Sequence, residues 1–174
     1  MLFRSFIGPK THVSARYVIR AGEASETQSS SGVVVSTGLG STGWLKSLLT
    51  GAAAIAEAAG VAELGRRMPA SPRPASNVKR GKPSDASKLG NFRSEFEWDS
   101  DSLVFTVREP FPAKTSGASI VFGRVTASAP LILESRMAEN GVVFSDGIES
   151  DFLEFNSGTQ AAITVAERKG ALVV

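Results

Sequence analysis

Short apolar runs separated by turn residues make up most of the chain. Val, Ile and aromatic residues dominate these runs, and this bias over about four to eight residues predicts strands. The runs are residues 2–7, 13–19, 33–36, 103–108, 119–125, 131–135, 142–145, 152–155, 161–166 and 171–174. The polar stretch 21–31 has no hydrophobic periodicity, and we predict a loop there.

Turn signals lie between the later runs. They are Asn140-Gly141, Asp146-Gly147, Asn156-Ser157-Gly158 and Lys169-Gly170. Asn-Gly and Asp-Gly suit two-residue hairpins because both central residues must accept positive φ. Short strands at this regular spacing predict a mainly β fold, an antiparallel β-sandwich-like or barrel-like domain.

One stretch has helical periodicity instead. Apolar residues recur there at three- and four-residue steps, at Trp44, Leu45, Leu48, Leu49, Ala52, Ile55, Ala59 and Leu64. Ser41 or Thr42 is a suitable N-cap. Gly51 and Gly60 each weaken the helix by about 1 kcal/mol relative to Ala, so it can divide into two pieces. We predict that this inserted helix is mostly buried.

Residues 66–100 differ in character from the rest. They are rich in Pro, Ser and basic residues and poor in apolar ones before Phe92. Such a composition cannot bury enough surface to offset the entropy of ordering, so we predict a flexible basic insertion. The alternative is a basic arm that contacts an anionic ligand or a neighbouring subunit.

Composition narrows the class of protein. The 174 residues suffice for a single domain, 1–174, and a net charge of +2 makes a nucleic-acid partner unlikely on charge alone. Because the chain has no Cys, disulfides and thiolate metal sites are excluded. We find no signal-peptide pattern, and the most apolar long run, 51–64, contains two Glu residues, so no membrane span is predicted. A cytoplasmic protein is expected, with the only histidine, His12, in a surface loop.

The candidate chemistry lies between the strand 33–36 and the helix. Gly38, Gly40 and Gly43 fall within six residues, among hydroxyl side chains. A glycine-rich turn lets backbone N–H groups approach a ligand, and the first helical turn leaves its N–H groups unpaired. The stretch therefore predicts a site for a phosphorylated or nucleotide-like ligand.

Two common glycine motifs fit this loop only in part. Residues 38–43 match G-x-G-x-x-G, but a Rossmann unit needs a second parallel strand after the helix, where this chain has its Pro- and Ser-rich insertion. The spacing of Gly38 and Gly43 is that of a P-loop, but Trp44-Leu45 replaces the Lys-Ser/Thr pair. The sequence therefore favours neither a Rossmann fold nor a P-loop.

A third match is better. Residues 36–44, Ser-Thr-Gly-Leu-Gly-Ser-Thr-Gly-Trp, resemble the Ser-Thr-Pro-Thr-Gly-Ser-Thr-Ala-Tyr segment of the NAD kinase family. The order of predicted elements agrees with the C-terminal, mainly β domain of that family, and Asp146-Gly147 resembles its late hairpin. The resemblance is closest to divergent members labelled predicted sugar kinases. It implies an NAD-kinase-like substrate- or nucleotide-binding domain, related to phosphotransferases.

Carried over by this resemblance, the substrate- or nucleotide-binding residues are Thr37, Gly40, Ser41, Thr42, Gly43, Trp44 and Ser47. Trp44 would supply an aromatic stacking face in place of the family's tyrosine. The alternative for Trp44 is an anchor at the head of the helix, and for Ser41 and Thr42 it is helix capping. A second polar loop at Arg108, with Lys114 beyond it, is either a rim for an anionic ligand or an ordinary edge turn.

Other features of the family have no counterpart. The chain lacks the Gly-Gly-Asp-Gly motif and the Asn-Glu pair, and Ser31 stands where the family has an Asp before the glycine motif. The catalytic residues are therefore unknown. We expect phosphoryl transfer to need an N-terminal domain supplied elsewhere, with ATP and Mg²⁺ implied only for such a complete protein. No metal site is predicted, because Asp146, Glu149, Asp151 and Glu154 lack EF-hand spacing.

Two functions remain open. The first is a binding domain for an NAD-like nucleotide or sugar-phosphate ligand. The second is a non-catalytic oligomerisation or scaffold module derived from such a domain. Because edge strands tend to pair, a homo-oligomer is expected in either case.

Overall fold

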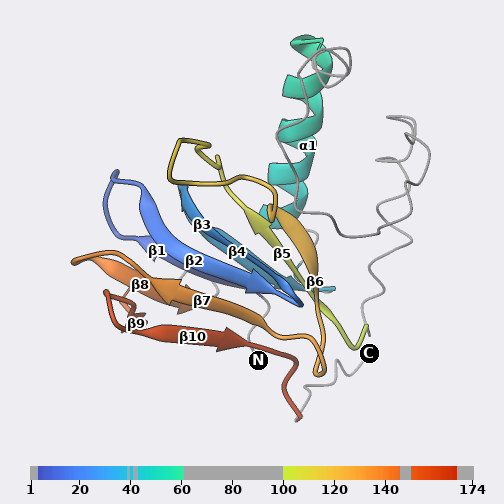
Figure 1. Cartoon of the computed structure of the whole chain (residues 1–174). Coiled ribbons are helices and arrows are strands. Elements are labelled where there is room, and N and C mark those ends of the chain that lie inside the picture. Colours follow the sequence, from blue (N-terminus) through green and yellow to red (C-terminus); the bar gives the residue numbers. More distant parts are fainter. Residues whose placement is uncertain (1–3, 39, 41–42, 61–99, 146–149, 168–174) are drawn as a thin grey trace.

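Two packed antiparallel sheets and one helix form the described part of the protein (Figure 1). The structure, a computed structural model, describes residues 4–38, 40, 43–60, 100–145 and 150–167. Its elements are β1 (Arg4–Pro9), β2 (Ala15–Ala21), β3 (Ala24–Ser30), β4 (Val33–Thr37), α1 (Trp44–Ala58), β5 (Leu103–Val107), β6 (Phe122–Val125), β7 (Leu131–Ser135), β8 (Gly141–Ser145), β9 (Phe152–Glu154) and β10 (Gln160–Ile163). The predicted mainly β, antiparallel sandwich-like fold with one helix after the glycine loop is confirmed.

The strands pair in an order that differs from their order in the chain. One sheet has the order β6-β5-β4-β1-β8-β9 and the other β10-β7-β2-β3. In the first sheet β1 is central, with Phe6 opposite Val34 of β4 and Phe144 of β8. Because β1 and β2 belong to different sheets, the chain crosses between the layers near its start.

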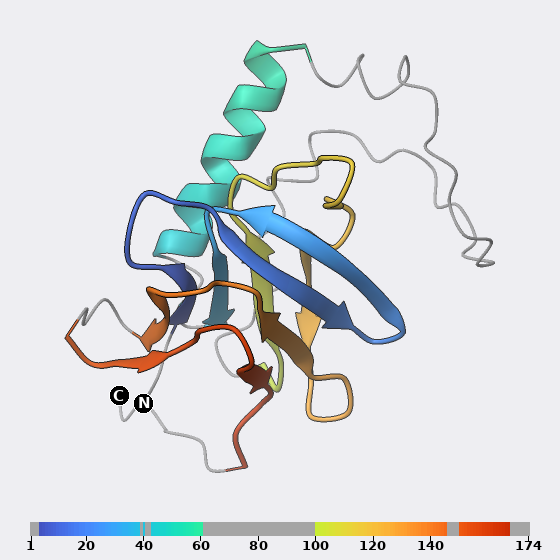
Figure 2. The same cartoon turned by 60° about the vertical axis from the view of Figure 1, so that its left-hand side comes forward.

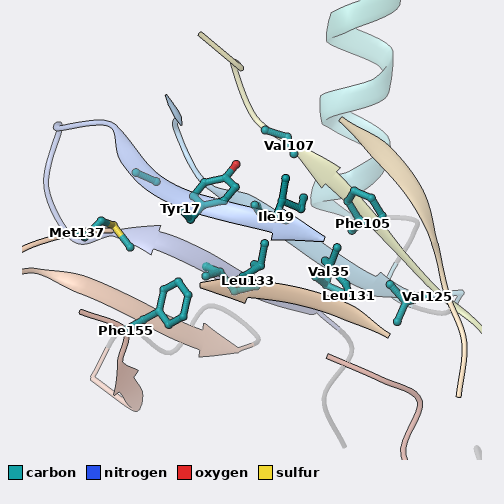
Figure 3. Close-up of a cluster of buried hydrophobic side chains, with 13 residues drawn as sticks. Tyr17, Ile19, Val35, Phe105, Val107, Val125, Leu131, Leu133, Met137 and Phe155 are labelled. Carbon is teal, nitrogen blue, oxygen red and sulfur yellow. The ribbon is translucent and has the colours of Figure 1, made fainter. Parts of the chain in front are cut away.

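Alternating side chains of both sheets fill the space between them (Figure 3). The six-stranded sheet contributes Ile7, Val33, Val35, Phe105, Val107 and Val125, and the four-stranded sheet contributes Tyr17, Ile19, Leu131 and Leu133. A shift of one residue in any of these strands would turn its apolar set toward the opposite face. The hydrophobic pattern therefore fixes the register.

The predicted loop at 21–31 is wrong, because β3 occupies most of it and pairs with β2 along its whole length. Its inward side chains are polar, which hid the strand from the hydrophobic pattern. Gln28 and Ser30 are buried, and both bond to the Tyr17 hydroxyl, at 3.0 and 2.7 Å. Hydrogen bonding thus replaces apolar packing on this strand.

The prediction of a mostly buried helix is also wrong. Leu45 is the buried residue of α1, at 1% exposure, and with Leu49 it packs against Val104 on the outer face of the six-stranded sheet. Ile55 is 70% exposed, and most of the helix rises beyond the sheets (Figures 1 and 2). Its periodicity correctly indicated a helix, but the small Ala side chains of 52–54 offer little apolar area to bury.

The helix runs unbroken through Gly51, so the division considered from the sequence does not occur within residues 44–58. It ends before Gly60, which has φ +63° and so suits a helix end. The expected extension to Leu64 lies outside the described residues.

Several expected turns and boundaries also differ. Asn140-Gly141 and Asn156-Ser157-Gly158 connect strands of different sheets and are not two-residue hairpins, although Asn140 does adopt a positive φ of 60°. β6 begins at Phe122 and not at 119. The turns Asp146-Gly147 and Lys169-Gly170, the strand 171–174 and nearly all of the 66–100 insertion lie outside the described residues.

Candidate functional site

The glycine loop connects the end of β4 to the start of α1. Within it the Gly40 N–H donates to Thr37 Oγ1 at 3.1 Å, and the Gly43 N–H donates to the Gly40 carbonyl at 3.3 Å. The Ser47 N–H and hydroxyl both donate to the Gly43 carbonyl, at 3.2 and 3.5 Å. These bonds link four of the predicted site residues, Thr37, Gly40, Gly43 and Ser47, and Trp44 directly follows Gly43 at the start of α1. Ser41 and Thr42 lie outside the described residues.

The head of α1 carries a positive end of the helix dipole. Gly43 is the N-cap residue, and no side chain within the described part of the chain caps the helix there. The first turn, Trp44 to Ser47, has no acidic residue, and it contains Lys46. N–H groups at such an end attract anions.

Arg4 of β1 reaches this helix head. Its Nη1 atom lies so close to Gly43 that a Cβ at that position would overlap it. A side chain at this third glycine of the loop would displace the end of the flexible Arg4 side chain. Arg4 was missed in the sequence, where the available signal was a basic residue at the start of a strand, opposite Ser36 of β4.

Trp44 is half-buried and joins an aromatic cluster on the outer face of the six-stranded sheet. Its ring stacks on Phe6 at a centroid distance of 5.7 Å and an interplanar angle of 19°. The Phe6 ring lies against the backbone of Gly32, where an added Cβ would be 2.6 Å from Cε2, and contacts Phe144 at 5.1 Å. This packing fits the anchor role considered for Trp44, because the indole fixes the helix head to β1.

Arg108, just after β5, also reaches Trp44. Its Cζ atom lies 5.2 Å from the centroid of the indole ring, in a cation–π arrangement. The Nε atom of this guanidinium is buried and has no hydrogen-bond partner among the described residues. Arg108, at the start of the second polar loop considered in the sequence, therefore contacts the first residue of α1.

The backbone around Arg108 is firmly held. Its N–H donates to the Gly32 carbonyl at 2.8 Å, and its carbonyl accepts from the Ser31 N–H at 2.9 Å. The next residue, Glu109, adopts a positive φ of 44°, and its carboxylate accepts a hydrogen bond from the Ser31 hydroxyl. The Arg108 backbone is therefore fixed, and less conformational entropy is lost when the guanidinium binds a ligand.

The described residues offer no set of ligands for Mg²⁺. They contain no group of three or more His, Cys, Asp or Glu side chains close enough to share an ion. Asp146 and Glu149 of the acidic cluster lie outside the described residues. Among the described residues, no helix has the length and apolar character of a membrane span.

The sequence matches no protein-family model and no curated protein.

Proposed function

We propose that this domain binds a phosphorylated small molecule, of the NAD-like nucleotide or sugar-phosphate class, at the head of α1. As the resemblance to the NAD kinase family implies, the domain would serve a cytoplasmic phosphotransferase as its substrate-binding part. The observation that carries the proposal is Arg108, whose buried Nε has no hydrogen-bond partner in the described part of the chain while its guanidinium lies over Trp44.

Three groups at this place favour an anion. Arg108 approaches the first residue of α1, Arg4 approaches its N-cap, and the first turn of the helix has N–H groups that no side chain of the described residues caps. A buried polar nitrogen without a partner costs about 1–3 kcal/mol, and an anionic acceptor would remove that cost. Arginine suits phosphate because its N–H groups can donate two parallel hydrogen bonds.

Trp44 provides the readout for the first test. Trp98→Phe leaves Trp44 as the only indole of the chain, and its fluorescence is followed during titration with NAD, NADP, ATP and sugar phosphates. We expect a saturable change with one of these ligands. Arg108→Gln should weaken that binding by about tenfold or more, because a charge-assisted hydrogen bond is lost.

Arg16→Gln is the matched control. Arg16 is an exposed arginine of β2 in the four-stranded sheet, so its loss changes the net charge equally at a distant place. Circular dichroism should show that both variants are folded. Equal binding by the Arg108 and Arg16 variants, or no saturable change with any ligand, would reject the proposal.

The alternative is an oligomerisation or scaffold module, favoured by the exposure of apolar side chains. Ile55 on the projecting helix and Leu153 on β9 are 70% and 72% exposed. Such a module needs no ligand, so its self-association would be unchanged by the ligands above and by Arg108→Gln.

A further inference from the structure

A hollow lies between the sheets, on the other side of β5 from the helix head. Phe105 of β5 and Leu131 of β7 are buried core residues that line it (Figure 3). The neighbouring residue Val104 faces the opposite way and packs against Leu45 of α1. The hollow is thus separated from the proposed phosphate site by the sheet itself.

The size of the hollow is that of a small-molecule site. Its volume is about 340 Å³, within the usual range for ligand pockets. The available space therefore admits a molecule of one or two fused rings.

Small residues keep this end of the sandwich open. Ala21, Gly22 and Ala24 of the β2–β3 hairpin line one side, and Ala129 and Pro130 before β7 line another. Gly123 of β6 also lies against Phe105, because a Cβ there would be only 2.7 Å from Cε1 of the ring. The glycine lets the Phe105 ring rest against the β6 backbone.

A carboxylate fixes the remaining wall. Glu26 accepts hydrogen bonds from the N–H groups of Ser119 and Ile120, at 2.9 and 2.8 Å, and also from the Ser119 hydroxyl and the Gln28 amide. Gln28 Nε2 also donates to the Ile120 carbonyl at 3.1 Å. The segment 119–120 is therefore tied to β3, which keeps the hollow formed in advance of binding.

The lining indicates an uncharged ligand. Arg124 is the one charged residue that lines the hollow. It pairs with Val104 in the sheet, and directly opposite residues share a face, so its side chain lies on the outer side with Val104. The Glu26 carboxylate is already engaged by four donors. Among the described lining residues, therefore, no charged side chain points into the hollow.

We propose that this hollow binds a neutral, apolar molecule, or an apolar substituent, of about the size of a bicyclic aromatic ring. Burial of apolar surface would supply the affinity, at about 25 cal/mol per Å² removed from water. Specificity would come from size, because the walls are held by backbone hydrogen bonds.

Indole is a suitable probe, followed by amide chemical shifts of the full-length protein in NMR titrations. We expect saturable shifts that centre on Gly22, Ile120 and Gly123. Ala24→Leu and Ala129→Leu should each fill part of the hollow and weaken indole binding by about tenfold or more. Ala54→Leu, at an exposed position of α1, adds the same side chain elsewhere and should leave the affinity unchanged.

Three outcomes of these experiments would contradict the proposed apolar site. Shifts that do not saturate, or that centre on residues away from the hollow, would overturn the proposal on the unmodified protein alone, even if a filling variant failed to fold. Folded filling variants that bind indole normally would also overturn it. Indole-3-carboxylate that binds as tightly as indole would refute the neutral character of the site.

Discussion

Tyr17 is the only tyrosine of the chain, and its hydroxyl lies in the core between Gln28 and Ser30. Burial strongly raises the pKa of this hydroxyl, the Ser30 hydrogen bond lowers it by less, and the charge of Glu26 raises it further. The phenol therefore stays neutral in the folded protein at pH values where an exposed tyrosine ionises.

This has a consequence at alkaline pH. The unfolded tyrosine loses its proton near pH 10, well below the folded pKa, so the free energy of unfolding should decrease as pH rises above about 10. We expect near-ultraviolet phenolate absorbance to appear only as circular dichroism shows unfolding. A phenolate that forms reversibly near pH 10 in an intact fold would contradict this.

Glu26 acts in the opposite pH range. Partial burial alone would raise the pKa of its carboxyl, but hydrogen bonds from Ser119, Ile120 and Gln28 outweigh burial and hold the pKa below its ordinary value of 4.5. The unfolded state thus binds more protons in this range. The contribution of Glu26 to stability is present above about pH 4.5 and is lost as pH falls through the folded pKa.

Glu26→Gln should therefore lower the free energy of unfolding at neutral pH, by about 1 kcal/mol because solvent screens this partly exposed carboxylate. Urea denaturation across the acidic range should show the variant and the unmodified protein converging as pH falls. Glu23→Gln removes a nearby exposed carboxylate of the β2–β3 turn and should change little. A pH-independent difference between the Glu26 variant and the unmodified protein would argue against this role.

At the scale of elements, α1 depends on a small contact. The helix packs on the sheet through Leu45, which is buried against Val104 with Leu49 beside it. The Trp44 ring adds a stack on Phe6. The isolated helix has 15 residues, a length at which helices are marginal in water. Its order therefore depends on this anchor at its first turns.

Leu45→Ala should lower the free energy of unfolding by about 2–4 kcal/mol, because it leaves a cavity against Val104. Far-ultraviolet circular dichroism should also lose helical signal before the sheets unfold. Ile55→Ala, at the exposed end of the same helix, should stay within about 0.5 kcal/mol of the unmodified protein. Equal effects of the two substitutions would mean that the far end of α1 is buried in solution.

At the scale of the whole molecule, both sheets have edges that could pair with another copy. β6 and β9 end the six-stranded sheet, whereas the edge of β3 is partly covered by bonds from Phe111 and Gly117 to Ser29 and Thr27. β9 is short and carries Leu153, an exposed leucine. We therefore expect self-association through the β9 edge of the six-stranded sheet.

Sedimentation velocity over a range of concentrations should show a dimer or larger species. Leu153→Lys should shift the population toward monomer, because a charged edge residue opposes strand pairing. Val13→Lys, at an exposed apolar residue of the β1–β2 loop, is the control and should leave the population of dimer unchanged. A monomer at every concentration would refute the expected oligomer.

Local sequence patterns were enough to predict the strands with apolar alternation and the glycine loop between a strand and a helix. These follow from local chemistry, since period-two patterns bury one face of a strand and glycines permit tight turns. The strand 131–135 was predicted with its observed bounds. Local chemistry also predicted an anion site in the glycine loop, whereas Thr37, Gly43 and Trp44 were implied as binding residues by the resemblance to the NAD kinase family.

Local patterns did not reveal which strands pair, where the helix lies or which cations reach the loop. β3 was hidden because its buried side chains satisfy one another by hydrogen bonds with Tyr17, a partner that no local pattern reveals. Arg4 and Arg108 are 104 positions apart, yet the pairing of β1, β4 and β5 brings both to the head of α1. Contacts between distant segments depend on the pairing of whole sheets, and that pairing is set by the packing of the complete core.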